Sequence, residues 1–322
     1  MAYISAVVPV YKGESCFEEL LRRLVSEMEI ISKDYEIVLV EDCGGDGSWK
    51  LICDAAKKNP RIKGIQLSRN SGEHHALSAG LDLCDGEWVV LLACDLQDPP
   101  EVIGDLYRKA KEGFDIVVAS RMNRKDSFGK ILFSMIYNRL ISWLADGKFD
   151  TKVANFRIVS RKVVLSFRKY RESIRSIPGI MNVMGFRATV LPIEHAERFA
   201  GKSSYNFYRS LRLALHNIIA YSDKPLKLAV YLGFFIASSS FLYGAFLILR
   251  TFVVGGTLPG WTSLIVSVFF VGGVNLSMMG VLGVYLGKVF NQVKGRPNYL
   301  ISEATFDAAS AINDKSLHPN RS

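Results

Sequence analysis

The sequence is poor in the features that mark disordered, fibrous and disulfide-stabilised chains. It has only 10 prolines in 322 residues, and hydrophobic residues make up 49% of it, which excludes disordered and fibrous classes. Its cysteines form no CxxC pair and no even framework, and a chain of this length does not need disulfides. We therefore expect reduced thiols facing the cytosol at Cys16, Cys43, Cys53, Cys84 and Cys94.

Signals for secretion and for nucleic-acid binding are also lacking. The apolar run at 4–10 is short, has no basic start and contains Pro9, so we expect no signal peptide. The formal net charge of +9 suits nucleic acid, an acidic membrane surface or a phosphate-bearing substrate. However, no aromatic-basic platform is present, so we expect no nucleic-acid partner.

Charge is absent from two long segments near the C-terminus. Residues 228–249 and 251–287 contain no Asp, Glu, Lys, Arg or His. A membrane-spanning helix needs about 20 apolar residues, so we predict two spans, roughly 227–250 and 262–287. Lys and Arg flank the pair on both outer sides, which predicts an integral protein of the inner or plasma membrane with both termini cytoplasmic. The alternative, a pair of buried core helices, would usually carry a polar stripe.

These segments divide the chain. Apolar residues at helical spacing between 204 and 222 indicate an interfacial helix on the bilayer, or else an ordinary solvated helix. The tail after Tyr299 is polar and carries no motif, although 304–311 permits a helix. The predicted regions are a soluble domain, a juxtamembrane amphipathic helix, a two-helix transmembrane hairpin and a cytoplasmic tail, at 1–202, 203–225, 226–290 and 291–322.

The first 200 residues alternate strand and helix signals. Strands are predicted at Ile4–Val10, Glu36–Val40, Lys63–Leu67, Trp88–Ala93 and Asp115–Ala119. Helices are predicted between them at Cys16–Ile31, Ser48–Lys57, Glu73–Cys84, Pro100–Glu112 and Lys130–Ala145. This alternation predicts an α/β domain with a mostly parallel, Rossmann-like sheet covered by helices on both faces. Ligands bind such sheets at the carboxyl ends of the strands, near a switch in strand order.

Acidic residues follow the second predicted strand. Glu41 and Asp42 precede a glycine-rich turn that contains Asp46, but the sequence has no GxGxxG. These three carboxylates would repel a pyrophosphate placed on that turn. Asp42 is better suited to accept hydrogen bonds from a base or a ribose, although an ordinary acidic turn with a helix cap fits the same residues.

Asp95, after the fourth predicted strand, indicates a ligand site more clearly than Asp42 does. With Gln97 and Asp98 close by, it offers hard oxygen ligands for Mg²⁺ or Mn²⁺. Such a metal would bridge the two phosphates of a nucleotide donor and stabilise the leaving nucleoside diphosphate. Asp98 before two prolines also makes a sound helix start. His74 and His75 are residue types that bind metals, but they are better placed for a helix entry.

Together these motifs resemble the family 2 glycosyltransferases of the GT-A fold, with a nucleotide-sugar-binding domain. Within them the resemblance is to the branch that loads sugars onto polyprenyl phosphates, the dolichol-phosphate mannose synthase-like and GtrB-like enzymes. The resemblance covers residues 3 to about 299, including both terminal spans. Its carriers are Val7–Tyr11, Val40–Asp42, Leu67–Asn70 with Gly72 and Ala79–Leu81, Asp95–Pro100, Ala119–Arg121, Asn155–Arg157, Arg198 with Gly201 and Ser203, and Ser222 with Pro225-Leu226.

The resemblance implies a role for each matching residue. The implied donor-binding residues are Pro9, Tyr11, Val40, Asp42, Cys94, Asp95, Gln97, Arg121 and Arg198, of which the first four hold the nucleoside. The implied metal ligands are Asp95 and Gln97, and the two arginines contact phosphates of donor or lipid. The implied catalytic residues are Asp95, Arg121, Asn155 and Arg157, and the last two lie where this branch handles the acceptor phosphate.

Three positions depart from the family pattern. Ala93 stands where the family commonly has the first Asp of an Asp-Ala-Asp motif, so weaker metal affinity is expected. Lys12-Gly13 replaces an Asn-Glu pair, with Glu14 one place late, and Ser204 replaces a frequent lysine. These changes bear on the identity of the donor more than on the class of reaction.

The resulting hypothesis is an inverting sugar transfer from a UDP- or GDP-linked donor to a polyprenyl phosphate, undecaprenyl phosphate, at the cytoplasmic face of the membrane. The membrane and the lipid would then be partners, and a homo-oligomer, a tetramer by resemblance alone, is a further expectation. A processive polysaccharide synthase is the first alternative, but two spans are too few for a polymer conduit and no Gln-x-x-Arg-Trp motif is present. The second alternative, suggested by Ala93, is a catalytically weakened membrane-anchored scaffold.

Overall fold

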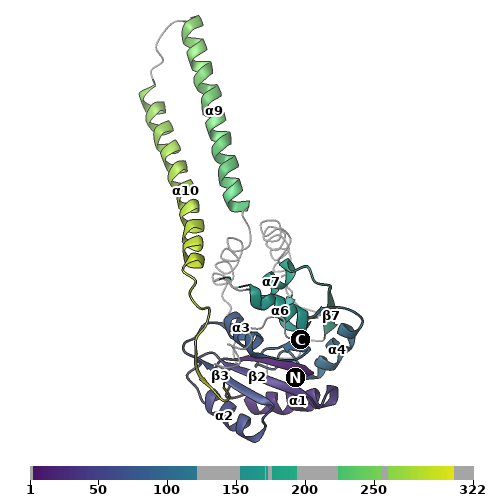
Figure 1. The fold of residues 1–322 in the computed structure, drawn as a ribbon. Helices are drawn as coiled ribbons and strands as arrows, with labels where there is room; N and C mark the ends of the chain where they lie inside the picture. Colours follow the sequence, from purple (N-terminus) through teal and green to yellow (C-terminus); the bar gives the residue numbers. More distant parts are fainter. Residues whose placement is uncertain are drawn as a thin grey trace, which may run out of the picture. The chain divides into compact units, whose positions relative to one another are not determined.

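The chain forms two compact units. The computed structural model describes residues 3–121, 153–170, 172, 176–193, 224–254 and 260–307. Of these, the first unit holds the described residues up to 193 and those from 297 onwards, and the second holds 224–254 and 260–296. Figure 1 draws the elements of both units.

The first unit is built on one eight-stranded sheet. Its strands are β1 (Ile4–Val10), β2 (Tyr35–Glu41), β3 (Ile62–Leu67), β4 (Trp88–Leu91), β5 (Ile116–Arg121), β6 (Val153–Ser160), β7 (Ala188–Ile193) and β8 (Ile301–Ala304). The strand order is β7-β5-β6-β4-β1-β2-β3-β8. The neighbours among β1 to β4 are parallel, as are β5 and β7, whereas β6 runs antiparallel to β4 and β5, and β8 antiparallel to β3. The sheet is therefore mixed but mostly parallel.

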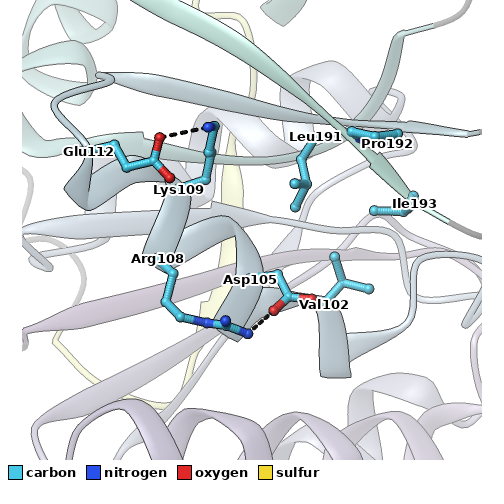
Figure 2. Close-up of a pocket in the computed structure, with 8 residues that line it drawn as sticks. All are labelled: Val102, Asp105, Arg108, Lys109, Glu112, Leu191, Pro192 and Ile193. Atoms are coloured by element: carbon cyan, nitrogen blue, oxygen red, sulfur yellow. Dashed lines mark hydrogen bonds and ion pairs between the residues drawn. The ribbon is translucent and has the colours of Figure 1, made fainter.

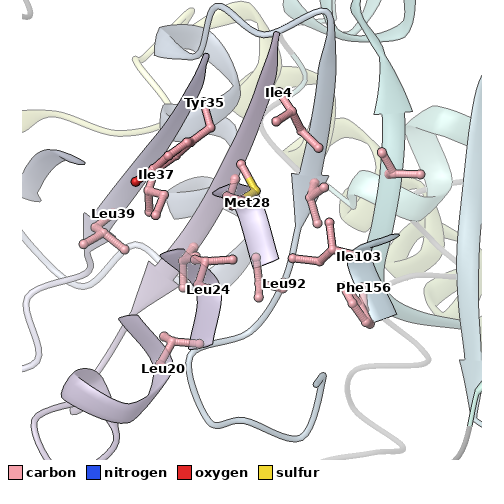
Figure 3. Close-up of a cluster of buried hydrophobic side chains, with 14 of the residues drawn as sticks. Ile4, Leu20, Leu24, Met28, Tyr35, Ile37, Leu39, Leu92, Ile103 and Phe156 are labelled. Atoms are coloured by element: carbon pink, nitrogen blue, oxygen red, sulfur yellow. The ribbon is translucent and has the colours of Figure 1, made fainter. Parts of the chain in front are cut away.

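Helices cover both faces of this sheet. They are α1 (Phe17–Ile31), α2 (Ser48–Lys58), α3 (Glu73–Leu83), the short 3-10 turn η1 (Pro100–Val102), α4 (Ile103–Lys111), α6 (Arg161–Lys169) and α7 (Ile177–Val183). On one face α1, α2 and α4 bury their apolar side chains against the strands, and Figure 3 shows Leu24 and Met28 of α1 beside Ile37 of β2. On the other face α3, α6 and α7 do the same. Burying each such side chain stabilises the fold by about 2 kcal/mol, so the two layers fix the sheet that carries the site.

The predicted parallel strands and their helices are confirmed to within a few residues at their ends. The predicted helix at 100–112 is present, but it begins as a 3-10 turn at Pro100. The helices predicted at 130–145 and 203–225 lie outside the described residues, except for the end of the second, where α9 begins at Lys224. The tail differs from expectation, because Ala304 ends strand β8 on the edge of β3.

The second unit consists of two long helices, α9 (Lys224–Val254) and α10 (Trp261–Val293). Their most apolar stretches, Leu226–Phe246 and Ser267–Val293, have mean hydropathies of 1.6 and 1.7, and no residue of either stretch whose exposure is described is buried. Both helices are therefore long and apolar enough to cross a membrane. Because these helices are exposed, the alternative that the sequence left open, a pair of buried core helices, is wrong.

Candidate active site

The candidate site lies at the carboxyl ends of the central strands. β1 pairs with β2 on one side and with β4 on the other, so the strand order reverses between β1 and β4. In open α/β sheets this switch point forms a crevice that binds ligands. The loops that follow β1 and β4, at 11–16 and 92–99, lie on its two sides.

The loops after β1 and β2 are hydrogen-bonded to each other. The backbone amide of Glu14 donates to Asp46 Oδ2 at 3.1 Å, and the amide of Gly47 donates to Glu14 Oε2 at 3.0 Å. The amide of Gly13 donates to Ser48 Oγ at 3.1 Å. Glu14, one place late in the family pattern, thus fixes the position of the glycine-rich turn.

Asp42 is buried and anchors a third loop. Its Oδ1 accepts the amide of Ser71 at 2.7 Å, and its Oδ2 accepts the amide of Gly72 at 2.8 Å. Burial raises the pKa of Asp42, although the two amides act in the opposite direction. The carboxylate therefore holds the start of α3 against the end of β2, and only its remaining lone pairs are available to a ligand.

The other predicted nucleoside-binding residues occupy different environments. Pro9 and Val40 lie opposite each other in β1 and β2, and both are buried. Val40 belongs to the apolar core under α3, which explains why this position needs an apolar residue. Tyr11, by contrast, is 48% exposed directly after β1, and Lys12 Nζ lies over its ring, 5.6 Å from the centroid.

Asp95 and Gln97 lie together in the loop after β4. The amide of Gln97 donates to Asp95 Oδ1 at 3.2 Å, and both side chains are half-buried. Leu96 between them is buried and has a φ of 58°, a left-handed conformation rare for a leucine. Asp98 is buried, consistent with the start of η1 rather than with an exposed ligand.

Left-handed backbone recurs around this crevice. Within the described residues, the non-glycine residues with positive φ are Lys12, Cys43 and Leu96, and each follows one of the strands β1, β2 and β4. Such conformations cost about 1–3 kcal/mol each and persist where the surrounding structure holds them, commonly at functional sites.

The acidic loop after β4 fits a hard divalent cation only in part. No group of three or more His, Cys, Asp or Glu side chains with metal-binding geometry occurs among the described residues. Asp95 and Gln97 offer oxygen ligands of the kind that Mg²⁺ and Mn²⁺ take, and such cations commonly complete their coordination with substrate phosphates. The chemistry of these two side chains therefore suits a cation shared with a diphosphate.

A contact of Cys94 with Cys16 links the loop after β4 to the loop after β1. The thiol of Cys16, at the start of α1, lies 3.1 Å from the carbonyl oxygen of Cys94. Hydrogen bonding with the Cys94 side chain lowers the pKa of the Cys16 thiol to about 7. The same contact and burial raise the pKa of Cys94.

The predicted acceptor residues lie on β6 beside the start of α3. Asn155 Nδ2 donates to Glu73 Oε1 at 2.7 Å. Arg157 is only 2% exposed, its Nε donates to the carbonyl oxygen of Asn155 at 3.2 Å, and burial lowers its pKa to about 10. The guanidinium of Arg157 therefore lies below the surface, and the catalytic role that the resemblance implies for this residue stays a prediction.

His74 lies close to Arg157 and was not predicted to belong to the site. Burial, and then the positive charge of Arg157, lower the pKa of His74 to about 4. Its Nδ1 is buried and has no hydrogen-bond partner among the described residues. The expectation that residues 74–75 enter a helix is confirmed, since α3 begins at Glu73. No pattern in the sequence indicated that the Nδ1 of this ring is buried.

The remaining predicted residues are placed only in part. Arg121 ends β5, but its side chain lies outside the described residues, as does the whole of Arg198.

Figure 2 shows a separate surface hollow between α4 and β7, where Lys109 and Glu112 form an ion pair at 2.6 Å. None of the predicted site residues whose side chains the structure describes lines this hollow.

Comparison with known proteins gives the same family. A family model described as glycosyl transferase family 2 matches residues 5–169. The chain is 36% identical to an SfII prophage-derived bactoprenol glucosyl transferase of Shigella flexneri, with 94% of this chain and 98% of the relative covered. It is 33% identical to an undecaprenyl-phosphate 4-deoxy-4-formamido-L-arabinose transferase of Salmonella choleraesuis, with 97% of each chain covered.

A solved structure supports the fold. Glucosyl-3-phosphoglycerate synthase from Mycobacterium tuberculosis, in complex with Mn²⁺, uridine diphosphate and its product, aligns with a TM-score of 0.51 at 13% identity, covering 68% of this chain and 78% of that one. The shared fold is the mostly parallel GT-A sheet. Sequence motifs, fold and full-length relatives agree, and this chain belongs to glycosyltransferase family 2.

Proposed function

We propose that the protein transfers a sugar from a nucleoside diphosphate donor to undecaprenyl phosphate at the cytoplasmic face of the membrane. The observation that carries the proposal is the likeness to two polyprenyl-phosphate sugar transferases over at least 94% of this chain, spans included. The crevice between β1 and β4 supplies a site for the nucleotide, and α9 and α10 supply the apolar segments that keep the enzyme beside a lipid acceptor.

The donor would bind across the switch point. Exposed Tyr11 offers a ring to the base, while Asp42 keeps the loop at 68–72 in place and accepts from the base or ribose through its free lone pairs. Asp95 and Gln97 would hold Mg²⁺ or Mn²⁺ together with the diphosphate. When bound, the cation neutralises the charge that develops on the leaving nucleoside diphosphate. Arg121 and Arg198 are proposed to contact donor or lipid phosphates.

The acceptor needs little activation by the protein. Its phosphate is already an anion at neutral pH, so one of its oxygens attacks the anomeric carbon while the bond from that carbon to the diphosphate breaks. In-line attack inverts the configuration at this carbon. The protein then contributes positioning and charge stabilisation. Asn155 would orient the phosphate, and buried Arg157 would act through its positive potential and its hydrogen bond to the Asn155 backbone.

The membrane arrangement is part of the proposal. Both termini would be cytoplasmic, since lysines and arginines flank the two spans on that side. Each such residue near an anionic surface is worth about 1 kcal/mol of attraction, which would also draw the lipid phosphate towards the domain. A tetramer is proposed from the family resemblance alone.

The sugar is the variable part of the reaction. The two relatives carry different sugars in their names, glucose and 4-deoxy-4-formamido-L-arabinose, so the acceptor chemistry is shared while the donor differs. The test is to incubate the purified protein with undecaprenyl phosphate, Mg²⁺ or Mn²⁺ and a panel of radiolabelled UDP- and GDP-sugars, and then to extract lipid. We expect label in the lipid with one donor class.

Two other outcomes of this assay would contradict the proposal. Label recovered in a polymer would favour a processive polysaccharide synthase. No transfer with any donor would favour a membrane-anchored scaffold, for which Ala93 in place of a carboxylate is the supporting observation.

A further inference from the structure

A glutamate outside the predicted set contacts one of the predicted acceptor residues. Glu73 is the first residue of α3, and its Oε1 accepts a hydrogen bond from Asn155 Nδ2 on β6 at 2.7 Å. The loop before Glu73 is fixed, because Asp42 accepts the amides of Ser71 and Gly72 at 2.7 and 2.8 Å. Backbone that belongs to the site therefore places this carboxylate against Asn155.

A buried cation lies beside this contact. Arg157 is two residues from Asn155 on β6, so the two side chains leave the strand on the same face of the sheet. The Arg157 Nε donates to the carbonyl oxygen of Asn155 at 3.2 Å. Burial lowers the pKa of Arg157, and the negative charge of Glu73 opposes this effect. A guanidinium shielded from water needs a negative partner, and Glu73 contributes that charge here.

We propose that Glu73 is an exchangeable counter-ion, which the phosphate of the lipid acceptor displaces from Asn155. This inference rests on the proposed function, in which Asn155 orients that phosphate. A phosphate monoester carries a charge of about −1.5 to −2 at neutral pH, whereas a carboxylate carries a single charge. The phosphate is therefore the stronger partner for a buried cation. Because the two anions repel each other, the carboxylate leaves the amide of Asn155 when the phosphate binds there.

Exposure decides which partner moves. The Glu73 side chain is exposed, and hydrogen bonds and ion pairs between exposed groups are weak, so releasing it costs little. Arg157 is only 2% exposed and stays in place while its negative partner changes. A glutamine at position 73 would keep an oxygen that accepts from Asn155 Nδ2, but it would remove the charge that competes with the phosphate.

The test is equilibrium binding of two lipids to the full chain in detergent. The probes are undecaprenyl phosphate and undecaprenol, which has the same chain but no phosphate. We expect Glu73→Gln to bind undecaprenyl phosphate at least about threefold more tightly than the wild type does, with unchanged binding of undecaprenol. The KM for undecaprenyl phosphate in the transfer assay should fall by a similar factor.

A matched control separates this contact from a general effect of charge. Glu18→Gln removes an exposed carboxylate from the first turn of α1, the same kind of position that Glu73 occupies in α3. It should bind both lipids as the wild type does. Melting temperatures show whether both variants are folded.

Three outcomes would overturn the inference. The first is equal affinity of the wild type and Glu73→Gln for undecaprenyl phosphate. The second is weaker binding by Glu73→Gln, because Glu73 would then hold Asn155 ready for the phosphate instead of competing with it. The third is equal tightening by Glu18→Gln. Binding does not require sugar transfer, so tighter binding by Glu73→Gln without labelled lipid from any donor would support the exchange and contradict the proposed transfer.

Discussion

Three ionisable side chains around the site are shielded from solvent, Asp42 and Arg157 almost completely and His74 in part, and burial changes the pKa of each. Burial raises the pKa of Asp42, and it lowers the pKa of His74 to about 4 and that of Arg157 to about 10. Sequence motifs identified Asp42 and Arg157 as site residues, but they could not show that both side chains point inward. A long cationic side chain can lie on a surface or in a core, and only packing decides between them.

His74 makes the stability of the fold depend on pH. Its ordinary pKa is 6.5 and its pKa in the folded protein is about 4, so the unfolded chain binds a proton first as the pH falls. Stability attributed to this ring should therefore decline between about pH 6.5 and pH 4, by up to about 3 kcal/mol. The measurement is the melting temperature of the full chain across this range.

A pair of variants isolates the contribution of this ring. His74→Gln should flatten the acid decline of the melting temperature, because the side chain no longer titrates. The neighbouring His75→Gln is the matched control and should keep the decline, since it removes only a ring whose Nδ1 lies 2.8 Å from the carbonyl oxygen of Ser71. Equal pH profiles for the wild type and His74→Gln would show that the ring is not the source.

At the scale of elements, the central strands were predictable because their short, mostly apolar segments alternate with helical segments. β1, β2 and β4 are buried along their whole length, which gives an unambiguous pattern. β6 was missed because Asn155 and Arg157 interrupt its apolar residues and were interpreted only as a motif. β8 was missed because it has four residues and pairs with a strand more than 230 positions away, as Ser302 with Gln66 illustrates.

The packing of α3 on β1 depends on the lack of a side chain at Gly80. A Cβ there would lie 2.2 Å from Val7 Cγ1. Gly80→Ala should lower the free energy of unfolding by about 1–3 kcal/mol through overpacking. Adding Val7→Ala should restore part of that loss, and Gly104→Ala, where a Cβ meets nothing within 4 Å, should be neutral or stabilising. A neutral Gly80→Ala in urea unfolding would contradict this packing.

The end of α3 is held by arginine. Arg168 donates from Nε to the carbonyl oxygen of Leu81 at 2.9 Å and from an NH2 nitrogen to that of Cys84 at 2.6 Å. These carbonyls lie in and just after the last turn of the helix, where backbone amides of the same helix run out, so the contacts cap it. Arg168→Leu should cost about 1–3 kcal/mol of unfolding free energy. Arg108→Leu, which removes an arginine 79% exposed on α4, should cost far less in the same assay.

At the scale of the whole molecule, the long apolar segments lie in one unit and the acidic and polar motifs in the other. The charge-free segments form two exposed apolar helices, and the acidic and polar motifs gather at one edge of the sheet. We expect the protein to stay in the membrane fraction after washing with high salt and with alkaline carbonate, and to be released by detergent. Release by salt alone would mean that basic residues, rather than the spans, attach it.

The proposed function is tested most directly by measuring sugar transfer to undecaprenyl phosphate by matched variants. Purified wild type, Asp95→Asn and Asp54→Asn, whose carboxylate is exposed on α2 and pairs with Lys57, are assayed for labelled lipid with the accepted donor. We expect label with the wild type and with Asp54→Asn, and a loss of at least about 100-fold with Asp95→Asn, because Asp95 would hold the cation on the diphosphate. Undiminished transfer by Asp95→Asn, or no labelled lipid from the wild type with any donor, would contradict it.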